Sequence, residues 1–146
     1  LQVIITAMEW MNITDIADKQ VDSLSGGQRQ RVWMALALAQ DTDILFLDEP
    51  TTFLDIQYQI EILDHLYELN QKKQTTIVMV LHDINLAARY SHHLFALKKG
   101  SLVTKGKPEE ILTPSLIKDV YGLDCKIIED PYYHCPMVLP MGKHKA

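Results

Sequence analysis

The sequence predicts an α/β protein in which parallel strands are flanked by helices. Two short apolar runs, Ile44–Leu47 and Thr76–Leu81, have the length and composition of strands that are buried on both faces. Residues 28–39 and 56–73 alternate with these runs and repeat their apolar residues at the spacing of amphipathic helices. This alternation is typical of a parallel sheet covered by helices.

The segment before the first strand is predicted to be helical. A helix over residues 2–11 and a short turn through Asp18 lead to a second helix, which begins after Ser25. The apolar stripe of this second helix has i, i+3, i+4 and i+7 spacing and consists of Val32, Ala35, Leu36 and Ala39. Ser25 can cap the helix, or it can donate to a phosphate oxygen that also meets the backbone N–H groups of the first turn. For a serine and two glycines taken alone, the plain cap is the commoner outcome.

Acidic residues follow the first strand, and a histidine follows the second. Carboxylates at the carboxyl end of a parallel strand lie where open α/β sheets bind ligands. Asp48 is suited to hold Mg²⁺, directly or through water, and Glu49 is suited to polarise an attacking water. His82, at the end of the second strand, could reach the same crevice. Each feature also has a simpler interpretation, a solvated turn for the acids and a turn or a helix cap for the histidine.

The remaining elements are shorter. The helix over residues 56–73 is predicted to pack through a face formed by Ile56, Ile60, Leu63 and Tyr67. A helix over residues 84–90 precedes a hairpin over residues 94–104, and Pro108 and Pro114 begin two short helices. The tail is predicted to be irregular because it contains three prolines, Pro131, Pro136 and Pro140.

The composition is that of a globular segment with one core. The chain has 146 residues, of which 47% are hydrophobic, and its net charge of −5 disfavours a nucleic-acid partner, since phosphate backbones require a concentrated basic surface. No apolar run approaches the roughly 20 residues of a membrane helix, and the first residues lack a signal-peptide pattern. Cys125 and Cys135 are expected to remain free thiols, and the histidines and cysteines lack zinc spacing.

Four ordered motifs resemble those of the ATP-binding subunit of ABC transporters, and the resemblance covers nearly all of the chain. The residues that match the signature motif are Leu24, Ser25, Gly26, Gly27 and Gln28. Residues 44–48 are similar to the family's magnesium-site strand, Glu49 to its catalytic glutamate and His82 to its switch histidine. Residues 52–55 are similar to its D-loop, although Thr52 and Phe53 replace the small residues that many members have there.

Within this family, residues 81–90 look most like the ATPases of iron(III)-siderophore, haem and cobalamin importers. Ile56-Gln57 and residues 106–112 lean the same way. The resemblance therefore implies an importer, with iron(III)-siderophore as the favoured cargo. Because the cargo never touches the ATPase subunit in this family, no residue of this chain is expected to bind or recognise the cargo.

The resemblance implies a partial P-loop NTPase core of the ABC type together with part of a helical subdomain. Residues 1–40 would be part of the helical signature subdomain, and residues 41–146 the carboxyl-terminal part of the catalytic core and the tail. ATP and Mg²⁺ are the implied cofactors of the intact parent, with weak or no binding in this chain. The implied partners are integral-membrane permease subunits, a second copy of the ATPase and, indirectly, a substrate-binding protein, at the cytoplasmic face of the cell membrane.

ATP is sandwiched between two subunits in this family, and the resemblance assigns residues to both sides of that site. One subunit would contribute Asp48 as the magnesium holder, Glu49 as the general base for the attacking water and His82 as the contact to the γ-phosphate. The other would contribute Asp55 and residues 24–28, whose serine and glycine amides would clamp the γ-phosphate. The signature serine and the glutamate of one chain would therefore act in two different ATP sites.

The phosphate-cradling loop that these motifs normally serve is absent from the sequence. Such a loop needs a glycine, four further residues and then Gly-Lys-Ser or Gly-Lys-Thr. The nearest string, residues 100–108, has neither the spacing nor the hydroxyl, and the family's upstream glutamine loop is absent as well. We therefore expect the chain to be the carboxyl-terminal part of a longer protein, to show no measurable ATP hydrolysis alone and to expose apolar strand edges.

Two interpretations from other classes remain open. A non-transport ABC-type ATPase of DNA repair or chromosome organisation would place a long heptad coiled coil before the signature, and residues 1–23 show no sustained heptad. A non-enzymatic binding module would use the segment after Gly100 for partner contacts, and residues 111–146 contain enough apolar residues for that role.

Overall fold

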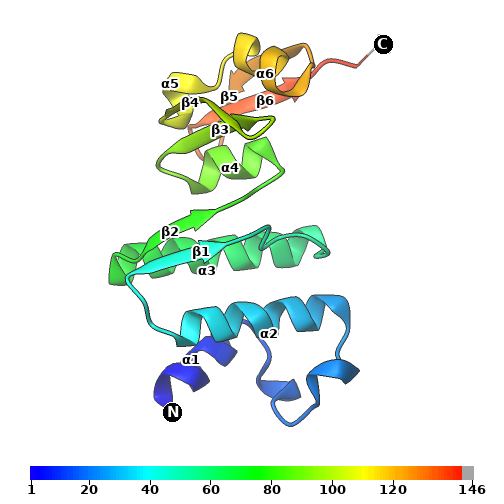
Figure 1. Ribbon diagram of the computed structural model, residues 1–146, viewed down its shortest axis with the longest axis vertical. Helices are drawn as coiled ribbons and strands as arrows, with labels where there is room; N and C mark the ends of the chain where they lie inside the picture. The colour runs from blue at the N-terminus through cyan, green and yellow to red at the C-terminus, as the bar shows by residue number, and fades with distance from the viewer. Residues whose placement is uncertain (143–146) are drawn as a thin grey trace. The chain divides into compact units, whose positions relative to one another are not determined.

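The computed structural model describes residues 1–142, which form two compact units (Figure 1). Unit 1 comprises Leu1–Leu81, and unit 2 begins at His82. The predicted subdomain boundary between residues 40 and 41 falls inside unit 1, and it stays a prediction. Residues 143–146, the end of the predicted second segment, lie outside the described residues. Among the described helices, none combines the length and the apolar composition that crossing a bilayer requires.

The first part of unit 1 consists of two helices joined by two turns of 3₁₀ helix. The helices are α1, Gln2–Trp10, and α2, Gly26–Ala39, and the turns are Thr14–Ile16 and Val21–Ser23. α1 packs against α2, and the buried apolar side chains of this region are Ala7, Met11, Ile13, Ile16, Leu24, Met34 and Ala35. Both predicted helices are confirmed, and α1 is one residue shorter than predicted.

The predicted apolar stripe of α2 faces a cavity instead of a closed core. The whole stripe lines this cavity, whose volume is about 410 Å³, opposite α1 residues such as Ile4 and Met8. Of the stripe residues, Ala35 is buried and Leu36 is 54% exposed. The spacing therefore identified one face of the helix correctly, but the expected burial of that face was wrong, because the side chains of α1 and the turns line the cavity without filling it.

Unit 1 also contains a two-stranded parallel sheet. β1, Ile44–Leu47, pairs in parallel with β2, Thr76–Met79, which confirms both predicted strands, although β2 ends two residues early. Leu45 and Leu47 are buried, whereas Phe46 between them is 74% exposed, and alternate residues of β2 are exposed in the same way. Burial on both faces was therefore wrong, because one face of the pair packs on a helix and the other has no covering layer within unit 1.

The helix that connects these strands is α3, Ile56–Lys73, and it ends at Gln74 in a left-handed conformation with φ of 59°. Its buried residues are Ile62, Leu63, Leu66 and Leu69. The predicted packing face was therefore partly wrong, since Leu63 is buried but Ile56 is 77% exposed and Tyr67 is exposed as well. α3 carries apolar residues on more than one row, and spacing alone does not tell which row meets the sheet.

Unit 2 consists of short helices and two antiparallel hairpins. Its elements in chain order are α4, Ile84–Tyr90, β3, Leu94–Lys98, β4, Ser101–Gly106, α5, Pro108–Ile111, α6, Pro114–Tyr121, β5, Cys125–Glu129, and β6, Pro136–Pro140. β3 pairs with β4 and β5 with β6. The core of the unit consists of Ala88, Leu112, Ile117, Cys125 and Val138. The predicted α4, the first hairpin and the two helices that begin with proline are confirmed.

The prediction of an irregular tail was wrong, because the tail forms the β5–β6 hairpin. Pro136 is the first residue of β6 and Pro140 is the last, and Pro131 lies in the connecting turn. A proline at a strand end removes no hydrogen bond from the middle of the ladder, and so the strand is preserved. Whether the segment forms a strand therefore depends on where the prolines lie in it, and not on how many prolines it contains.

Both cysteines are free thiols, as predicted. Cys125 is buried in the core of unit 2, and Cys135 packs against the same core. Burial raises the pKa of the Cys135 thiol, and the nearby charge of Asp130 acts in the same direction. The thiol is therefore protonated and unreactive at neutral pH.

Candidate functional site

The start of α2 is closed by a reciprocal capping box. Ser25 Oγ accepts a hydrogen bond from the Gln28 N–H at 3.2 Å, and Gln28 Oε1 accepts one from the Ser25 N–H at 3.0 Å. The predicted cap is therefore confirmed, and the hydroxyl hydrogen of Ser25 can still be donated to another group. The first helical turn also presents the N–H groups of Gly26 and Gly27, which have no partner inside the helix. These donors and the helix dipole suit the binding of an anion. That the anion is a phosphate stays a prediction.

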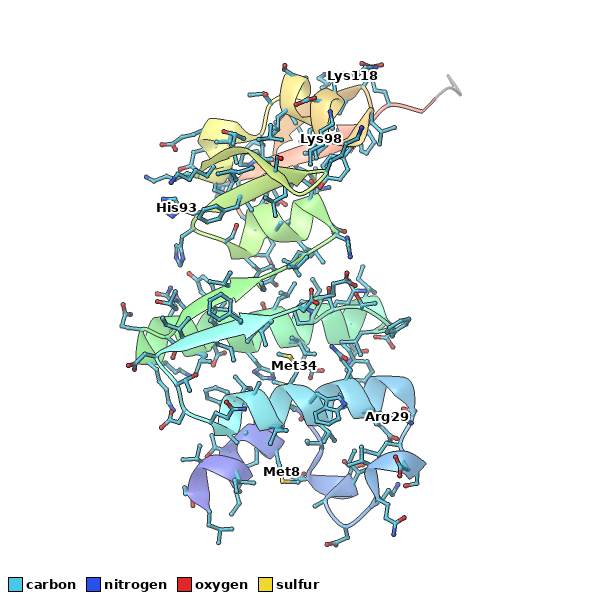
Figure 2. All side chains as sticks on the ribbon, in the orientation of Figure 1. Met8, Arg29, Met34, His93, Lys98 and Lys118 are labelled. Atoms are coloured by element: carbon cyan, nitrogen blue, oxygen red, sulfur yellow. The ribbon has the colours of Figure 1, made fainter. Side chains whose placement is uncertain are left out.

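The first turns of α2 pack against the loop that joins β1 to α3. The Gln30 side chain donates to the Pro50 carbonyl oxygen at 3.4 Å, and the Leu54 side chain lies 3.5 Å from the position that a Cβ would take at Gly27. Met34, one turn farther along, is buried and lies on the side of α2 that faces α3 (Figure 2). Unit 1 therefore brings the predicted anion-binding turn and the predicted acidic loop side by side.

Glu49 has a left-handed backbone conformation with φ of 51°. Residues other than glycine rarely adopt this conformation, and the proline that follows disfavours helical conformations at Glu49. Thr52 holds it in place, because the Thr52 N–H donates to the Glu49 carbonyl oxygen at 3.1 Å and Thr52 Oγ1 donates to Glu49 Oε2 at 3.0 Å. Six other non-glycine residues among those described also have a positive φ, so the conformation alone does not mark Glu49, and its role in chemistry stays a prediction.

Asp48 and Asp55 lie at the two ends of the same loop, and both side chains are exposed. Asp55 is the N-cap of α3, and its carboxylate accepts a hydrogen bond from the Tyr58 N–H at 3.1 Å. Between the two acids, Phe53 has φ of 64° and is 89% exposed. The cap gives Asp55 a structural role in this chain, and its contact to a second subunit stays a prediction.

His82 belongs to unit 2, and its side chain is exposed. The next residue caps α4, since Asp83 Oδ1 accepts hydrogen bonds from the N–H groups of Asn85 at 2.8 Å and Leu86 at 3.0 Å. The cap that the simpler interpretation assigned to the histidine is therefore made by the aspartate. His82 lies directly before a capped helix in which the backbone is fixed.

Asp48 is the oxygen donor that the sequence proposes for Mg²⁺, and the adjacent Glu49 is assigned to the attacking water. Across residues 1–142, no three His, Cys, Asp or Glu side chains are grouped as ligands of a metal ion. Mg²⁺ typically keeps several waters and binds through one or two carboxylates together with phosphate oxygens. Asp48 therefore suits Mg²⁺ that arrives with a bound phosphate, and the described residues form no closed metal site around it.

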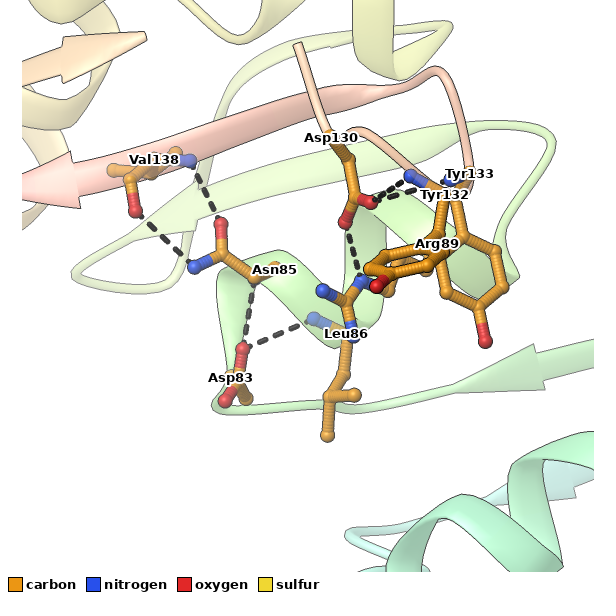
Figure 3. Close-up of polar contacts among 8 residues, drawn as sticks. All are labelled: Asp83, Asn85, Leu86, Arg89, Asp130, Tyr132, Tyr133 and Val138. Carbon is orange, nitrogen blue, oxygen red and sulfur yellow. Dashed lines mark hydrogen bonds and ion pairs between the residues drawn. The ribbon is translucent and has the colours of Figure 1, made fainter. Parts of the chain in front are cut away.

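Sequence reasoning missed a cluster in unit 2 that centres on Asp130. This carboxylate is 1% exposed and accepts hydrogen bonds from Arg89 Nε at 2.7 Å, from the Tyr132 N–H at 2.9 Å and from the Tyr133 N–H at 3.2 Å (Figure 3). The Tyr132 N–H, with the Tyr133 N–H and the Arg89 guanidinium, holds the pKa of the Asp130 carboxyl below its ordinary value, although burial acts in the opposite direction. An aspartate directly before a proline is a turn signal that could have indicated this cluster.

Unit 2 is expected to lose stability in acid through Asp130. A carboxyl whose pKa is lowered by folding stabilises the folded state above its unfolded pKa, ordinarily 3.8, and loses that contribution as the pH falls through the folded pKa. Amide hydrogen exchange of β5 and β6 between pH 6 and pH 3 would measure this loss. The variant Asp130→Asn should show a weaker acid dependence, whereas Asp119→Asn, which removes an exposed partner of Lys98, should keep that of the parent chain. Equal dependence in both variants would show that Asp130 is not responsible.

Removing the cap of α2 is expected to destabilise unit 1. Ser25→Ala should lower its free energy of unfolding by about 0.5–2 kcal/mol, and Ser25→Asp should restore most of it. Urea unfolding followed by tryptophan fluorescence reports on unit 1 alone, because Trp10 and Trp33 both belong to it. Ser23→Ala is the matched control, since that hydroxyl donates to the carbonyl oxygen of Gln20, three residues earlier, and caps no helix. An equal loss in the control would contradict the role of the cap.

The sequence is similar to ATP-binding proteins of transport systems. Residues 2–52 match the family model described as ABC transporter. The chain is 52% identical over 140 residues to the Probable siderophore transport system ATP-binding protein YusV of Bacillus subtilis, which covers 96% of this chain and 51% of that protein. It is also 52% identical over 142 residues to the Ferric enterobactin transport ATP-binding protein FepC of Escherichia coli, covering 97% and 52%. The chain spans about half the length of the curated relatives it matches.

Solved structures show the same fold. An ABC transporter described as of the metal-chelate type, in an inward-facing conformation, matches with a TM-score of 0.83 and 30% identity over 97% of this chain and 57% of that chain. The dimeric ATP-binding cassette MJ0796, bound to ADP and Pi after hydrolysis, matches with a TM-score of 0.67 and 35% identity over 70% of this chain and 44% of that chain. The two units are therefore part of a known nucleotide-binding architecture.

Proposed function

This chain belongs to the ABC transporter ATPases, and we propose that it forms part of the ATP-hydrolysing subunit that powers an ABC importer. The observation that carries the proposal is the arrangement in unit 1, where the exposed first turn of α2 packs against the loop that bears Glu49. The helix start suits the binding of a phosphate, and the threonine-held glutamate suits the activation of a water; each would serve a different ATP site of the dimer.

The proposed cargo of the importer is an iron(III)-siderophore. The names of both relatives describe siderophore or ferric enterobactin transport, and the matching transporter structure is described as of the metal-chelate type. These names favour a transport ATPase over an ATPase of DNA repair, and two further relatives from Bacillus are named as import proteins. They support the proposal through similarity, since no residue of the chain reads the cargo.

The proposed roles follow the chemistry of each side chain. Glu49 accepts a proton from the attacking water, His82 contacts the γ-phosphate, and Asp48 holds Mg²⁺, which when bound neutralises phosphate charge. Ser25 and the backbone donors that follow it act on the ATP of a second subunit, together with Asp55. The donor set of the α2 turn and the loop geometry around Glu49 support these roles.

The proposed partners are a second copy of the ATPase and integral-membrane permease subunits, with a substrate-binding protein acting indirectly. ABC cassettes dimerise and work in transporter complexes, as the dimeric cassette and the matching transporter illustrate. A peripheral position at the cytoplasmic face of the membrane follows from this assembly. No nucleic acid is needed for any of these contacts.

We expect the isolated chain to hydrolyse no ATP, because it has no lysine and amide cradle for the phosphates. Phosphate release and fluorescent-ATP titration should be measured for the chain alone and after mixing with the amino-terminal half of the Bacillus subtilis relative. Hydrolysis only in the mixture would support the proposal that the chain is part of a catalytic unit. Hydrolysis by the chain alone would contradict the expected inactivity, and failure of the mixture both to bind and to hydrolyse would favour a non-enzymatic binding module.

A further inference from the structure

Asn85 occupies the edge of β6 in the way that a neighbouring strand would. Its Nδ2 donates to the Val138 carbonyl oxygen at 3.1 Å, and its Oδ1 accepts from the Val138 N–H at 2.8 Å (Figure 3). Val138 is buried, and without this amide its backbone groups would lack their partner. One side chain therefore ties the first turn of α4 to the middle of β6.

Arg89 makes a second tie, one helical turn later. Arg89 Nε donates to Asp130 Oδ2 at 2.7 Å, and the guanidinium lies over the Tyr133 ring, 4.9 Å from its centroid. Residues four apart share one face of a helix, so Asn85 and Arg89 both point to the β5–β6 hairpin. Their partners lie at opposite ends of the stretch from Asp130 to Val138, which fixes both the direction and the rotation of α4.

α4 depends on these contacts for its position. It has only seven residues, and isolated helices of that length are marginal in water. Ala88 in its middle shares the apolar core of unit 2 with Val138. The helix begins at Ile84 behind the Asp83 cap, so the backbone at His82 continues directly into it.

We propose that the β5–β6 hairpin is the platform that positions His82, and that Asn85 and Arg89 are positioning residues that act through α4. The inference rests on the proposed function in one respect, because the proposed function assigns to His82 the contact with the γ-phosphate. The hairpin, which the sequence did not predict, thereby gains a role in placing the histidine within unit 2.

The test compares Asn85→Ala and Arg89→Lys with the parent chain. Both variants leave the net charge unchanged, so a change at His82 reports position and not an added charge. The matched control is Asn70→Ala, which removes a similar amide bond, from Asn70 Nδ2 to the Thr75 carbonyl oxygen at 2.9 Å, in unit 1. The readouts are amide exchange of α4 and the imidazole NMR signals of the chain, with the His82 signal assigned through His82→Gln.

We expect α4 exchange to rise roughly tenfold in both variants, through loss of hydrogen bonds to part-buried groups, and the His82 imidazole signal to move. The imidazole signal of His65, which stacks on Trp10 in unit 1, should stay in place, and the control should change neither α4 nor His82. A rise in α4 exchange with an unmoved His82 signal would overturn the proposal. So would an unchanged α4, or unfolding of unit 2 in both variants. If the His82 signal moves but the mixture with the amino-terminal half of the Bacillus subtilis relative binds no nucleotide, the proposed function alone is refuted.

Discussion

Replacing Glu49 by glutamine is expected to lower ATP hydrolysis by the mixture of this chain and the amino-terminal half of the Bacillus subtilis relative about 10²- to 10⁴-fold. Glutamine keeps the size of the side chain and an oxygen that can accept the Thr52 hydroxyl bond, 3.0 Å in the parent chain, but it cannot take a proton from the attacking water. The backbone at this position, with φ of 51°, is equally unfavourable for both residues. The loss should therefore appear in turnover and not in nucleotide affinity.

The matched control for this substitution is Glu61→Gln. Glu61 Oε1 accepts a hydrogen bond from Asn12 Nδ2 at 2.8 Å within the same unit, and glutamine preserves that bond. Phosphate release and fluorescent-ATP affinity should both stay near the parent values in this control. Equal turnover in Glu49→Gln and the parent mixture would show that another group activates the water.

Truncating Leu63 to alanine is expected to destabilise unit 1 by about 2–5 kcal/mol. The Leu63 side chain is 0% exposed and belongs to the row of α3 that is buried. The loss combines the removed apolar contacts with the cavity that remains, since neighbours in a close-packed interior relax only in part. Urea unfolding followed by the fluorescence of Trp10 and Trp33 would show a lower midpoint at an unchanged slope.

Ile56→Ala provides the comparison on the same helix. Ile56 was predicted to share the packing face of Leu63, but it is exposed, and so its truncation should change stability by no more than about 0.5 kcal/mol. A loss in Ile56→Ala as large as that in Leu63→Ala would mean that the predicted face, which includes both residues, is the buried one.

Local features of the candidate site were predictable from the sequence. The Ser25 cap, the strand that ends before Asp48 and the α4 helix after His82 all depend on residues within a few positions of one another, because capping, turn formation and helix or strand periodicity act over that range. The strain at Glu49 was not predictable, since a positive φ at a residue other than glycine has no local sequence signal.

The sequence by itself predicted the family, the main helices and strands as far as α6 and the set of candidate site residues, since motif spacing and apolar periodicity are properties of short segments. Only the tertiary structure decided which row of α3 is buried, that the prolines of β6 stand at strand ends, and that Asn85 bonds Val138 from 53 residues away. Burial and hydrogen-bond partners depend on which surfaces meet, and distant segments contribute those surfaces. Sequence patterns therefore indicate which side chains can react, whereas tertiary packing determines where those side chains lie.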